Sequence, residues 1–344
     1  MNKKKASWRS VAAWTLALLI ISGNLPTEVR ADAPESENSQ PAAQNQDGFV
    51  IENGVLTEYT GSEKDVVIPD GVKVIGDGSS PIFGSMVESV TIPASVEKIS
   101  DSAFSTCTGL KSITFAQGSQ LTEIGDEAFY AVNQVVNLVV PEGVKSIGQY
   151  AFAAMSKLES VTLPSTLETV GGDWFGDLFA RGKYGGAPEM LTSVNFADGN
   201  LNYSSYDGAV YSADGKTLIY CPAAKTSIDW KNGVETIKSD AFRKSNLAGI
   251  VIPEGIVTIE ADAFNGTNAG SVTFPSTLKT IGYMAFYNSK LKSIEFSEGL
   301  ETIESMAFSE VYASGSISIT LPSTLKSVGG SAFDCLTDSG RPLA

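Results

Sequence analysis

The stretch Ile99-Ser-Asp-Ser-Ala-Phe104 decides the fold, because it returns along the chain with its apolar residues at the same spacing. It recurs as Ile124-Gly-Asp-Glu-Ala-Phe129 and as Ile147-Gly-Gln-Tyr-Ala-Phe152. Further copies occupy Ile237–Phe242, Ile259–Phe264, Ile281–Phe286, Ile303–Phe308 and Val328–Phe333, with a variant at Val170–Phe175. Undisturbed copies lie 22 to 25 residues apart. Such a period is typical of a solenoid, whose units cannot bury an apolar face alone and stack on their neighbours.

Each repeat also contains the pattern L-x-x-L-x-L, for example in Leu110–Phe115 and Leu158–Leu163. Its last three positions predict a short strand with two side chains inward and one outward. A proline often follows and ends the strand, because proline has no N–H for the ladder. The Ala-Phe pair then predicts a single helical or 3₁₀ turn, with Asp101, Asp240 or Asp262 suited to cap it.

The strand pattern predicts eleven coils. They are centred near Val67, Thr91, Thr114, Val139, Thr162, Asn195, Asp229, Val251, Thr273, Glu295 and Thr320. The predicted fold is therefore a repeat solenoid of the leucine-rich-repeat type. We expect a continuous parallel β-sheet on one face and short helical or 3₁₀ turns and loops on the other.

The N-terminus has the features of a secretory signal peptide over residues 1–31. Lys3-Lys4-Lys5 and Arg9 precede the apolar run Val11–Ile21, and Val29-Arg30-Ala31 supplies a cleavage site. The apolar run is shorter than the roughly 20 residues that a spanning helix needs. We therefore expect a secreted, extracellular chain, with association to the cell surface left open and no transmembrane segment after cleavage.

The remaining chain divides into three parts. Residues 32–48 are polar, without apolar periodicity, and predict a disordered linker. Residues 49–61 surround Asn53-Gly54, a strong hairpin signal, and predict an N-terminal β-hairpin cap over the first edge of the stack. Residues 62–344 form the predicted solenoid, in which an insertion at about 176–227 interrupts the period. This insertion contains a predicted hairpin over Val210-Tyr211 and Leu218–Tyr220.

Taken together, the repeats resemble the BspA-type leucine-rich repeats of bacterial surface proteins, also called the leucine-rich repeat 5 family. The shared pattern is L-x-x-V-x-I-P-x-x-V-x-x-I-G-x-x-A-F, and the resemblance covers residues 49–344. The opening Asn53–Tyr59 followed by Val66-Val-Ile-Pro69 is also similar to a start seen in that family. The resemblance implies a curved right-handed solenoid on a bacterial secreted or cell-wall protein that serves adhesion or ligand binding.

The composition argues against several functions. After removal of residues 1–31, 19 basic residues face 38 acidic ones, a formal charge of −19, which disfavours nucleic acid as a partner. The chain has no histidine, which excludes Ser-His-Asp and Cys-His catalysis and every His-containing zinc site. Cys107, Cys221 and Cys335 are unclustered, and we expect no disulfide. No cofactor, metal or catalytic residue is predicted, and the protein is not expected to be an enzyme.

Two groups of residues are candidates for ligand binding. The first is the outward row of the sheet, represented by Thr91, Thr114, Thr162 and Asn195 and flanked by serines. A flat face of short hydroxyls can accept a long partner closely. The alternative is that Ser and Thr tolerate close strand spacing and hydrogen-bond to one another.

The second group consists of the tyrosines of the insertion: Tyr184, Tyr203, Tyr206, Tyr211 and Tyr220. Insertions in solenoids often carry the functional face, and exposed tyrosine is favoured in recognition surfaces. The alternative is a structural spacer whose rings pack on the coils. Trp230 falls at an inward strand position and is expected in the core.

We therefore predict a non-catalytic extracellular or cell-surface protein that binds an extracellular protein or glycan in adhesion, and that is a monomer. One alternative is an architectural spacer or a self-associating surface element. A weaker alternative is an ancillary glycan binder or a glycan-active enzyme.

Overall fold

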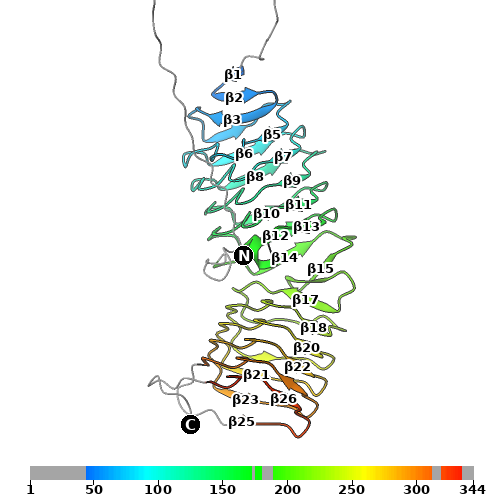
Figure 1. The fold of residues 1–344 in the computed structure, drawn as a ribbon. Helices are drawn as coiled ribbons and strands as arrows, with labels where there is room; N and C mark the ends of the chain where they lie inside the picture. The colour runs from blue at the N-terminus through cyan, green and yellow to red at the C-terminus, as the bar shows by residue number, and fades with distance from the viewer. Residues whose placement is uncertain (1–43, 173–174, 180–188, 312–318, 335–344) are drawn as a thin grey trace, which may run out of the picture. The chain divides into compact units, whose positions relative to one another are not determined.

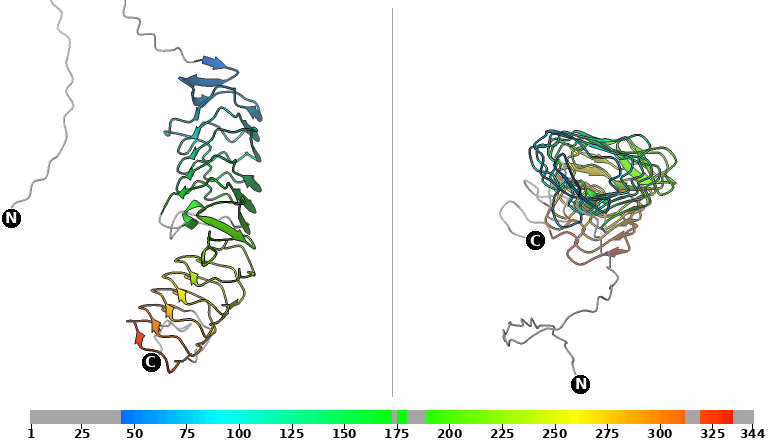
Figure 2. Two further views of the ribbon diagram at one scale, coloured as in Figure 1. Left: turned by 90° about the vertical axis from the view of Figure 1, so that its right-hand side faces the viewer. Right: turned by 90° about the horizontal axis from the view of Figure 1, so that it is seen from above.

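The computed structural model describes residues 44–172, 175–179, 189–311 and 319–334. Within these residues the chain winds into stacked coils, each built mainly of short strands and turns (Figure 1). Figure 2 shows the same stack from the side and, from above, the closed outline of the successive coils. The solenoid predicted from the repeats is confirmed. The predicted signal peptide and residues 32–43 of the predicted linker lie outside the described residues.

The strands predicted from the L-x-x-L-x-L pattern form what we call the first strand row. Neighbours within it pair in parallel, with matching repeat positions side by side, such as Ser89 with Ser112 and Val90 with Ile113. The row consists of β4 (Asp65–Val67), β6 (Ser89–Ile92), β8 (Ser112–Phe115), β10 (Asn137–Val139), β12 (Ser160–Leu163), β14 (Ser193–Phe196), β19 (Ile250–Val251), β21 (Ser271–Thr273), β23 (Ser293–Glu295) and β25 (Ile319–Thr320).

A second strand row, which the sequence analysis did not predict, follows the proline bend of each coil. Its two-residue strands end at the Ile or Val that opens each Ala-Phe segment, and they also pair in parallel. The row consists of β5 (Val74–Ile75), β7 (Lys98–Ile99), β9 (Glu123–Ile124), β11 (Ser146–Ile147), β13 (Thr169–Val170), β18 (Thr236–Ile237), β20 (Thr258–Ile259), β22 (Thr280–Ile281), β24 (Thr302–Ile303) and β26 (Ser327–Val328).

The expected continuous sheet is wrong, because the first row is divided into three sheets: β4-β6-β8, β10-β12-β14 and β19-β21-β23-β25. The residues around Asp229, predicted as a strand, do not form one. The turn of the insertion explains the second break. The N–H of Val194 donates to the carbonyl of Gly208, and the N–H of Asp229 donates to Oδ2 of Asp207, so this turn stands where the next strand would pair.

The predicted N-terminal hairpin is present as β2 (Phe49–Glu52) and β3 (Val55–Tyr59), which pair antiparallel. A third strand, β1 (Gln44–Gln46), pairs antiparallel with β2. Its residues fall in the predicted linker, so the described ladder begins before residue 49. On its other side β3 pairs in parallel with β5, and the hairpin thereby covers the first edge of the second row.

The insertion forms a three-stranded meander of β15 (Tyr203–Tyr206), β16 (Ala209–Ser212) and β17 (Thr217–Tyr220). The predicted hairpin is therefore present, and β17 pairs in parallel with β18 of the second row. Side chains of β16 alternate between two apolar clusters: Val210 packs with the coils before the insertion, and Ala209 and Tyr211 pack with those after it. The insertion thus joins the two parts of the core.

The recurring phenylalanines form the interior column that the sequence predicts. From the N-terminal hairpin to the end of the meander, ring centroids 4.8–6.2 Å apart connect Phe49, Tyr59, Phe83, Phe104, Phe129, Phe152, Phe179 and Tyr220. After it, centroids 4.7–5.6 Å apart connect Trp230, Phe242, Phe264, Phe286, Phe308 and Phe333. Burial of such rings is a major favourable contribution to each coil.

One register prediction is wrong by four residues. The sequence analysis assigned Phe175 to the column, but Phe179 occupies the stacking position between Phe152 and Tyr220. The reason is the 3₁₀ helix η1 (Phe175–Leu178), which lengthens this coil by one turn. Its Leu178 takes the role of the repeat's alanine, since the Leu178 carbonyl accepts the N–H of Phe152.

The other Ala-Phe segments are turns, and the predicted helical or 3₁₀ turn is wrong for them. The residue before the alanine has a positive φ, for example 58° at Ser102, and the Phe N–H donates to the next coil, as Phe104 does to the Ala128 carbonyl at 2.8 Å. The predicted cap Asp101 likewise accepts the N–H of Asp126 in the next coil. Backbone groups that a helix would pair locally therefore hold neighbouring coils together.

Candidate functional site

The outward side chains at the middle of the first-row strands form the first candidate surface. We call Val67, Thr91, Thr114, Val139, Thr162 and Asn195 the ladder face. Parallel pairing places Thr91 beside Thr114 in one sheet and Thr162 beside Asn195 in the next. The structure therefore brings the four predicted residues together as two pairs, one on each side of the break between β8 and β10. The two valines, which are 68% and 63% exposed, were not among the predicted binding residues. Their position within the strand pattern would have identified them.

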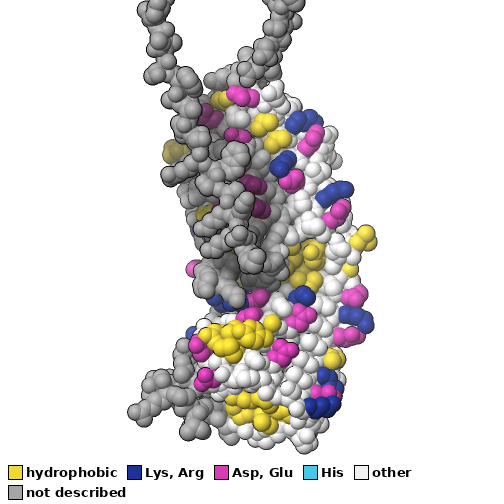
Figure 3. Space-filling view, viewed as in Figure 1, with side chains coloured by type: hydrophobic (Ala, Val, Ile, Leu, Met, Phe, Trp, Pro, Cys, Tyr) yellow, Lys and Arg dark blue, Asp and Glu magenta, His cyan; other side chains and the backbone are white. Residues whose placement is uncertain are grey.

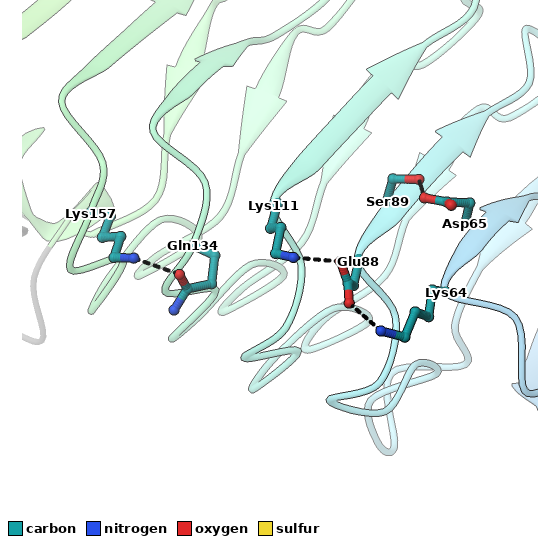
Figure 4. Close-up of polar contacts among 7 residues, drawn as sticks. All are labelled: Lys64, Asp65, Glu88, Ser89, Lys111, Gln134 and Lys157. Atoms are coloured by element: carbon teal, nitrogen blue, oxygen red, sulfur yellow. Dashed lines mark hydrogen bonds and ion pairs between the residues drawn. The ribbon is translucent and has the colours of Figure 1, made fainter.

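The serine column beside the ladder face is held by its own hydrogen bonds. Ser89 Oγ donates to Oδ1 of Asp65 at 2.6 Å (Figure 4), and Ser160 Oγ donates to Oδ1 of Asn137 at the same distance. Because the hydroxyls of these serines bond to the neighbouring strand, a structural role in the sheet is supported for them over ligand binding.

The threonines of the ladder face differ from these serines. Within the described part of the chain, no hydrogen bond joins the hydroxyls of Thr91, Thr114 or Thr162 to another residue. Each hydroxyl can donate one hydrogen bond and accept others. The column therefore presents uncommitted hydroxyls between exposed methyl groups, and it carries no charge.

Charged groups border the ladder face, and several of them contact one another or a polar neighbour. Figure 4 shows Glu88 between Lys64 and Lys111, with Lys64 Nζ 2.7 Å from Glu88 Oε1. Hydrogen bonds and charge from Lys111 and Lys64 lower the pKa of Glu88 to about 2. Further along the same border, Lys157 Nζ donates to Gln134 Oε1 at 2.7 Å. A small recess of about 260 Å³ lies among these residues.

The second strand row carries ion pairs along its outer edge, where Figure 3 shows basic and acidic side chains alternating. Lys73 pairs with Glu97 at 2.7 Å and Lys98 pairs with Glu123 at 2.7 Å. Exposed pairs of this kind contribute little stability each. They neutralise this edge, in contrast with the uncharged ladder face.

Two of the predicted tyrosines are core residues, and the structure corrects their assignment to a ligand site. Tyr211 is fully buried, with the Lys231 ammonium 5.7 Å from the centre of its ring. Tyr220 is also buried and stacks on Phe179 at 5.5 Å. Burial raises the pKa of Tyr211 to about 12 and raises that of Tyr220 as well. Their alternation along β16 and β17 directs them inward, which supports the spacer interpretation for these two rings.

The other tyrosines have different environments. Tyr206 is exposed. Tyr203 is half-buried and stacks on Phe196 at 5.1 Å, and burial raises its pKa. Tyr184 lies outside the described residues. Only Tyr203 and Tyr206 of this group are therefore shown with surface accessible to a partner.

Tyr203 lines a recess of about 410 Å³ at the break in the second strand row, between β13 and β17. Val170, Phe175 and Ile219 form its apolar part, and Lys238 lies at its border. Lys238 Nζ is 3.3 Å from Oε2 of Glu260, so its charge is already paired. The sequence predicts an insertion here but not the recess, which depends on how η1 and the meander interrupt the ladder.

Within the described residues, no three His, Cys, Asp or Glu side chains gather as a possible metal site. Cys107 and Cys221 are buried free thiols, and burial raises the pKa of both to about 12. Cys335 lies outside the described residues. In the same described part, no helix is long and apolar enough to cross a membrane.

The chain matches solved leucine-rich repeat structures. One is the pneumococcal vaccine antigen PcpA, at 21% identity over 86% of this chain and 87% of that chain, with a TM-score of 0.50. Another is a leucine-rich repeat protein from Eubacterium ventriosum, at 20% identity over 84% of this chain and 91% of that chain, with a TM-score of 0.51. At these low identities, the two structural matches establish a shared fold only. No curated protein sequence was found to match.

The repeats themselves match a family model over residues 82–180 and 219–338, which together exceed half of the chain. The interval between the two segments contains the meander, where the period is interrupted. The Ile-x-x-x-Ala-Phe segments and their stacked rings lie in the matched segments. The chain therefore belongs to the BspA-type leucine-rich repeat family.

Proposed function

We propose that this protein is displayed outside the bacterial cell and binds an extracellular protein or glycan through the ladder face, without catalysis. The observation that carries the proposal is the combination, at outward positions of the successive sheets β4-β6-β8 and β10-β12-β14, of exposed valines and threonine hydroxyls without protein partners. A parallel sheet with strands about 4.8 Å apart offers a partner a closely spaced array of such groups.

Charge supports the same surface. The chain has a formal charge of −15, yet the ladder face has no charged side chain, and Glu88 at its border is paired with Lys64 and Lys111. A partner meeting this face would not have to strip water from an unpaired charge, which is costly. The predicted signal peptide supports display outside the cell, and the similar pneumococcal protein is a vaccine antigen.

The test uses two valine-to-arginine variants. Val139→Arg places a long charged side chain in the middle of the ladder face, at an exposed strand position where it should not disturb folding. Val257→Arg is the matched control, because Val257 is 40% exposed and precedes β20 on the second row. The chain from residue 32 onward is first screened on arrays of extracellular matrix proteins and glycans.

We expect Val139→Arg to weaken binding to the captured partner at least tenfold and Val257→Arg to leave it unchanged. Equal affinity of the two variants for the partner would reject the ladder face as the binding surface. Self-association that rises with concentration and is abolished by Val139→Arg, without binding to any array member, would favour the architectural alternative. The exposed valines on β4 and β10 are the feature that would support that alternative.

A further inference from the structure

The second break in the first strand row opens a recess of about 450 Å³ between residues 226–230 and β19. Coils on either side of the break remain stacked elsewhere, since the N–H of Asn246 donates to the Ala223 carbonyl at 2.9 Å. No backbone hydrogen bond joins residues 226–230 to residues 248–253, all of which the structure describes. The two segments separate locally and leave a hollow of the size that small ligands occupy.

Backbone polar groups of β19 face this hollow. The N–H of Ile252 donates to the Thr273 carbonyl, and the Ala248 carbonyl accepts the N–H of Gly270, both at 3.0 Å. These alternate residues therefore bond toward β21. Because successive strand residues direct their backbone groups to opposite sides, those of Gly249 and Val251 point toward the recess, where no strand pairs with them.

The side chains around the recess are uncharged. Trp230, expected in the core, is half-buried: its ring packs against Phe242 at 5.6 Å, and the residue also lines the hollow. Val251 opposite is 69% exposed. The other lining residues are Thr226, Ser227, Ile228, Ala248, Gly249, Ile250 and Pro253. Figure 3 shows hydrophobic side chains gathered on the visible face between the levels of β17 and β21.

We propose that this recess binds a sugar ring of a neutral glycan. The proposal rests on the proposed function and names the ligand class for a further site on the first strand row, at the break before β19. The C–H face of a pyranose is apolar and suits the indole of Trp230 and the methyl groups of Val251. Its hydroxyls both donate and accept hydrogen bonds, which matches the free backbone groups of β19 and the hydroxyls of Thr226 and Ser227.

The same features disfavour an acidic glycan. No lysine or arginine lines the recess to offset the desolvation of a carboxylate or sulfate, and the chain is strongly acidic. An uncharged extended peptide is the competing ligand, because it too could bond to the edge of β19. The test separates the two.

Trp230 provides its own reporter. In a chain that begins at residue 32 and carries Trp174→Phe, Trp230 is the only tryptophan. We expect its fluorescence to change saturably on titration with neutral hexose and N-acetylhexosamine oligosaccharides, and to be unaffected by sialylated or sulfated ones. A saturable change only with uncharged peptides, or no change with any oligosaccharide, would overturn the proposal.

Two serine-to-arginine variants locate the effect. Ser227→Arg fills the recess from an exposed position without removing a core contact, and should weaken glycan binding at least tenfold. Ser293→Arg makes the same change at an exposed position of β23, outside the recess, and should leave glycan binding unchanged. Equal losses in both variants would also overturn the site.

The outcome is separable from that of the proposed function. Val139→Arg should leave the Trp230 signal intact, because Val139 lies on β10, beyond the break. If Val139→Arg loses binding on the array, but oligosaccharides do not change the Trp230 fluorescence, the proposed function is supported and glycan binding in the recess is refuted.

Discussion

Truncation of Phe264 to alanine should lower the free energy of unfolding by about 3–5 kcal/mol, the range for a large ring removed from a core. Phe264 is fully buried, and its ring centroid lies 4.7 Å from that of Phe242 and 4.8 Å from that of Phe286. The rings are parallel within 6° and 5°. Each such pair contributes about 0.5–1.5 kcal/mol beyond its buried area, so the two pairs account for about 1–3 kcal/mol of the loss.

A series of variants tests this magnitude by equilibrium urea unfolding followed by circular dichroism. Phe264→Leu keeps an apolar side chain but removes both ring pairs, and should lose about 1–3 kcal/mol. Tyr283→Ala truncates an exposed ring close by and should stay within about 0.5 kcal/mol of the unchanged chain. A loss below about 1.5 kcal/mol for Phe264→Ala, or one equal to that of Tyr283→Ala, would refute the packed column.

Hydrogen exchange locates the loss of stability in Phe264→Ala along the chain. Because each coil contacts mainly its neighbours, the amides of β20 and β22 should lose protection in Phe264→Ala before those of β7 and β9. Equal loss of protection in the two pairs of strands would mean that the coils before and after the insertion unfold as one unit. This would contradict the division of the core into two clusters.

Three further predictions follow from burial and charge. Tyr220→Ala should lower the free energy of unfolding in urea by about 3–5 kcal/mol, as for other large buried rings. Unchanged stability together with weakened ligand binding would instead show that Tyr220 belongs to the binding surface. In a Cys335→Ser background, Cys107 and Cys221 should not react with a disulfide reagent at pH 8 until the chain is denatured, because burial raises the pKa of both to about 12; labelling of the native chain would contradict their burial. The pKa of Glu88 is lowered from its ordinary 4.5 to about 2, so the stabilisation from its carboxylate is present above about pH 4.5 and is lost as the pH falls toward 2. Melting temperatures of Glu88→Gln should therefore fall less than those of the unchanged chain over this interval, and identical profiles would refute the pairing.

Close packing between coils explains a residue that the repeat pattern contains but does not account for. A Cβ added to Gly148 would lie 2.4 Å from the backbone nitrogen of Asp126 in the preceding coil. At Gly148 a side chain would therefore meet the preceding coil, whereas Ser100, Glu260 and Glu304 occupy the same repeat position in other coils. The sequence displays the recurrence of this glycine, but its reason requires the stacked structure.

The sequence by itself determined the coil. Its period placed the phenylalanines in one column, its strand alternation separated Thr91 from the core, and Asn53-Gly54 marked the first hairpin. These features follow from the geometry of a single chain segment, in which inward and outward positions alternate.

Only the tertiary structure decided what lies between coils. Hydrogen bonds to neighbouring coils replaced the expected helical turn, and they engaged Ser89 but left Thr91 free. Packing buried Tyr211 in the core that follows the insertion. The turn at Gly208 took the place of a strand beside β14, and residues 226–230 left a recess against β19 beside Trp230. Such outcomes depend on which groups a neighbouring segment presents across a few ångströms, and the spacing of residues within one repeat does not contain that information.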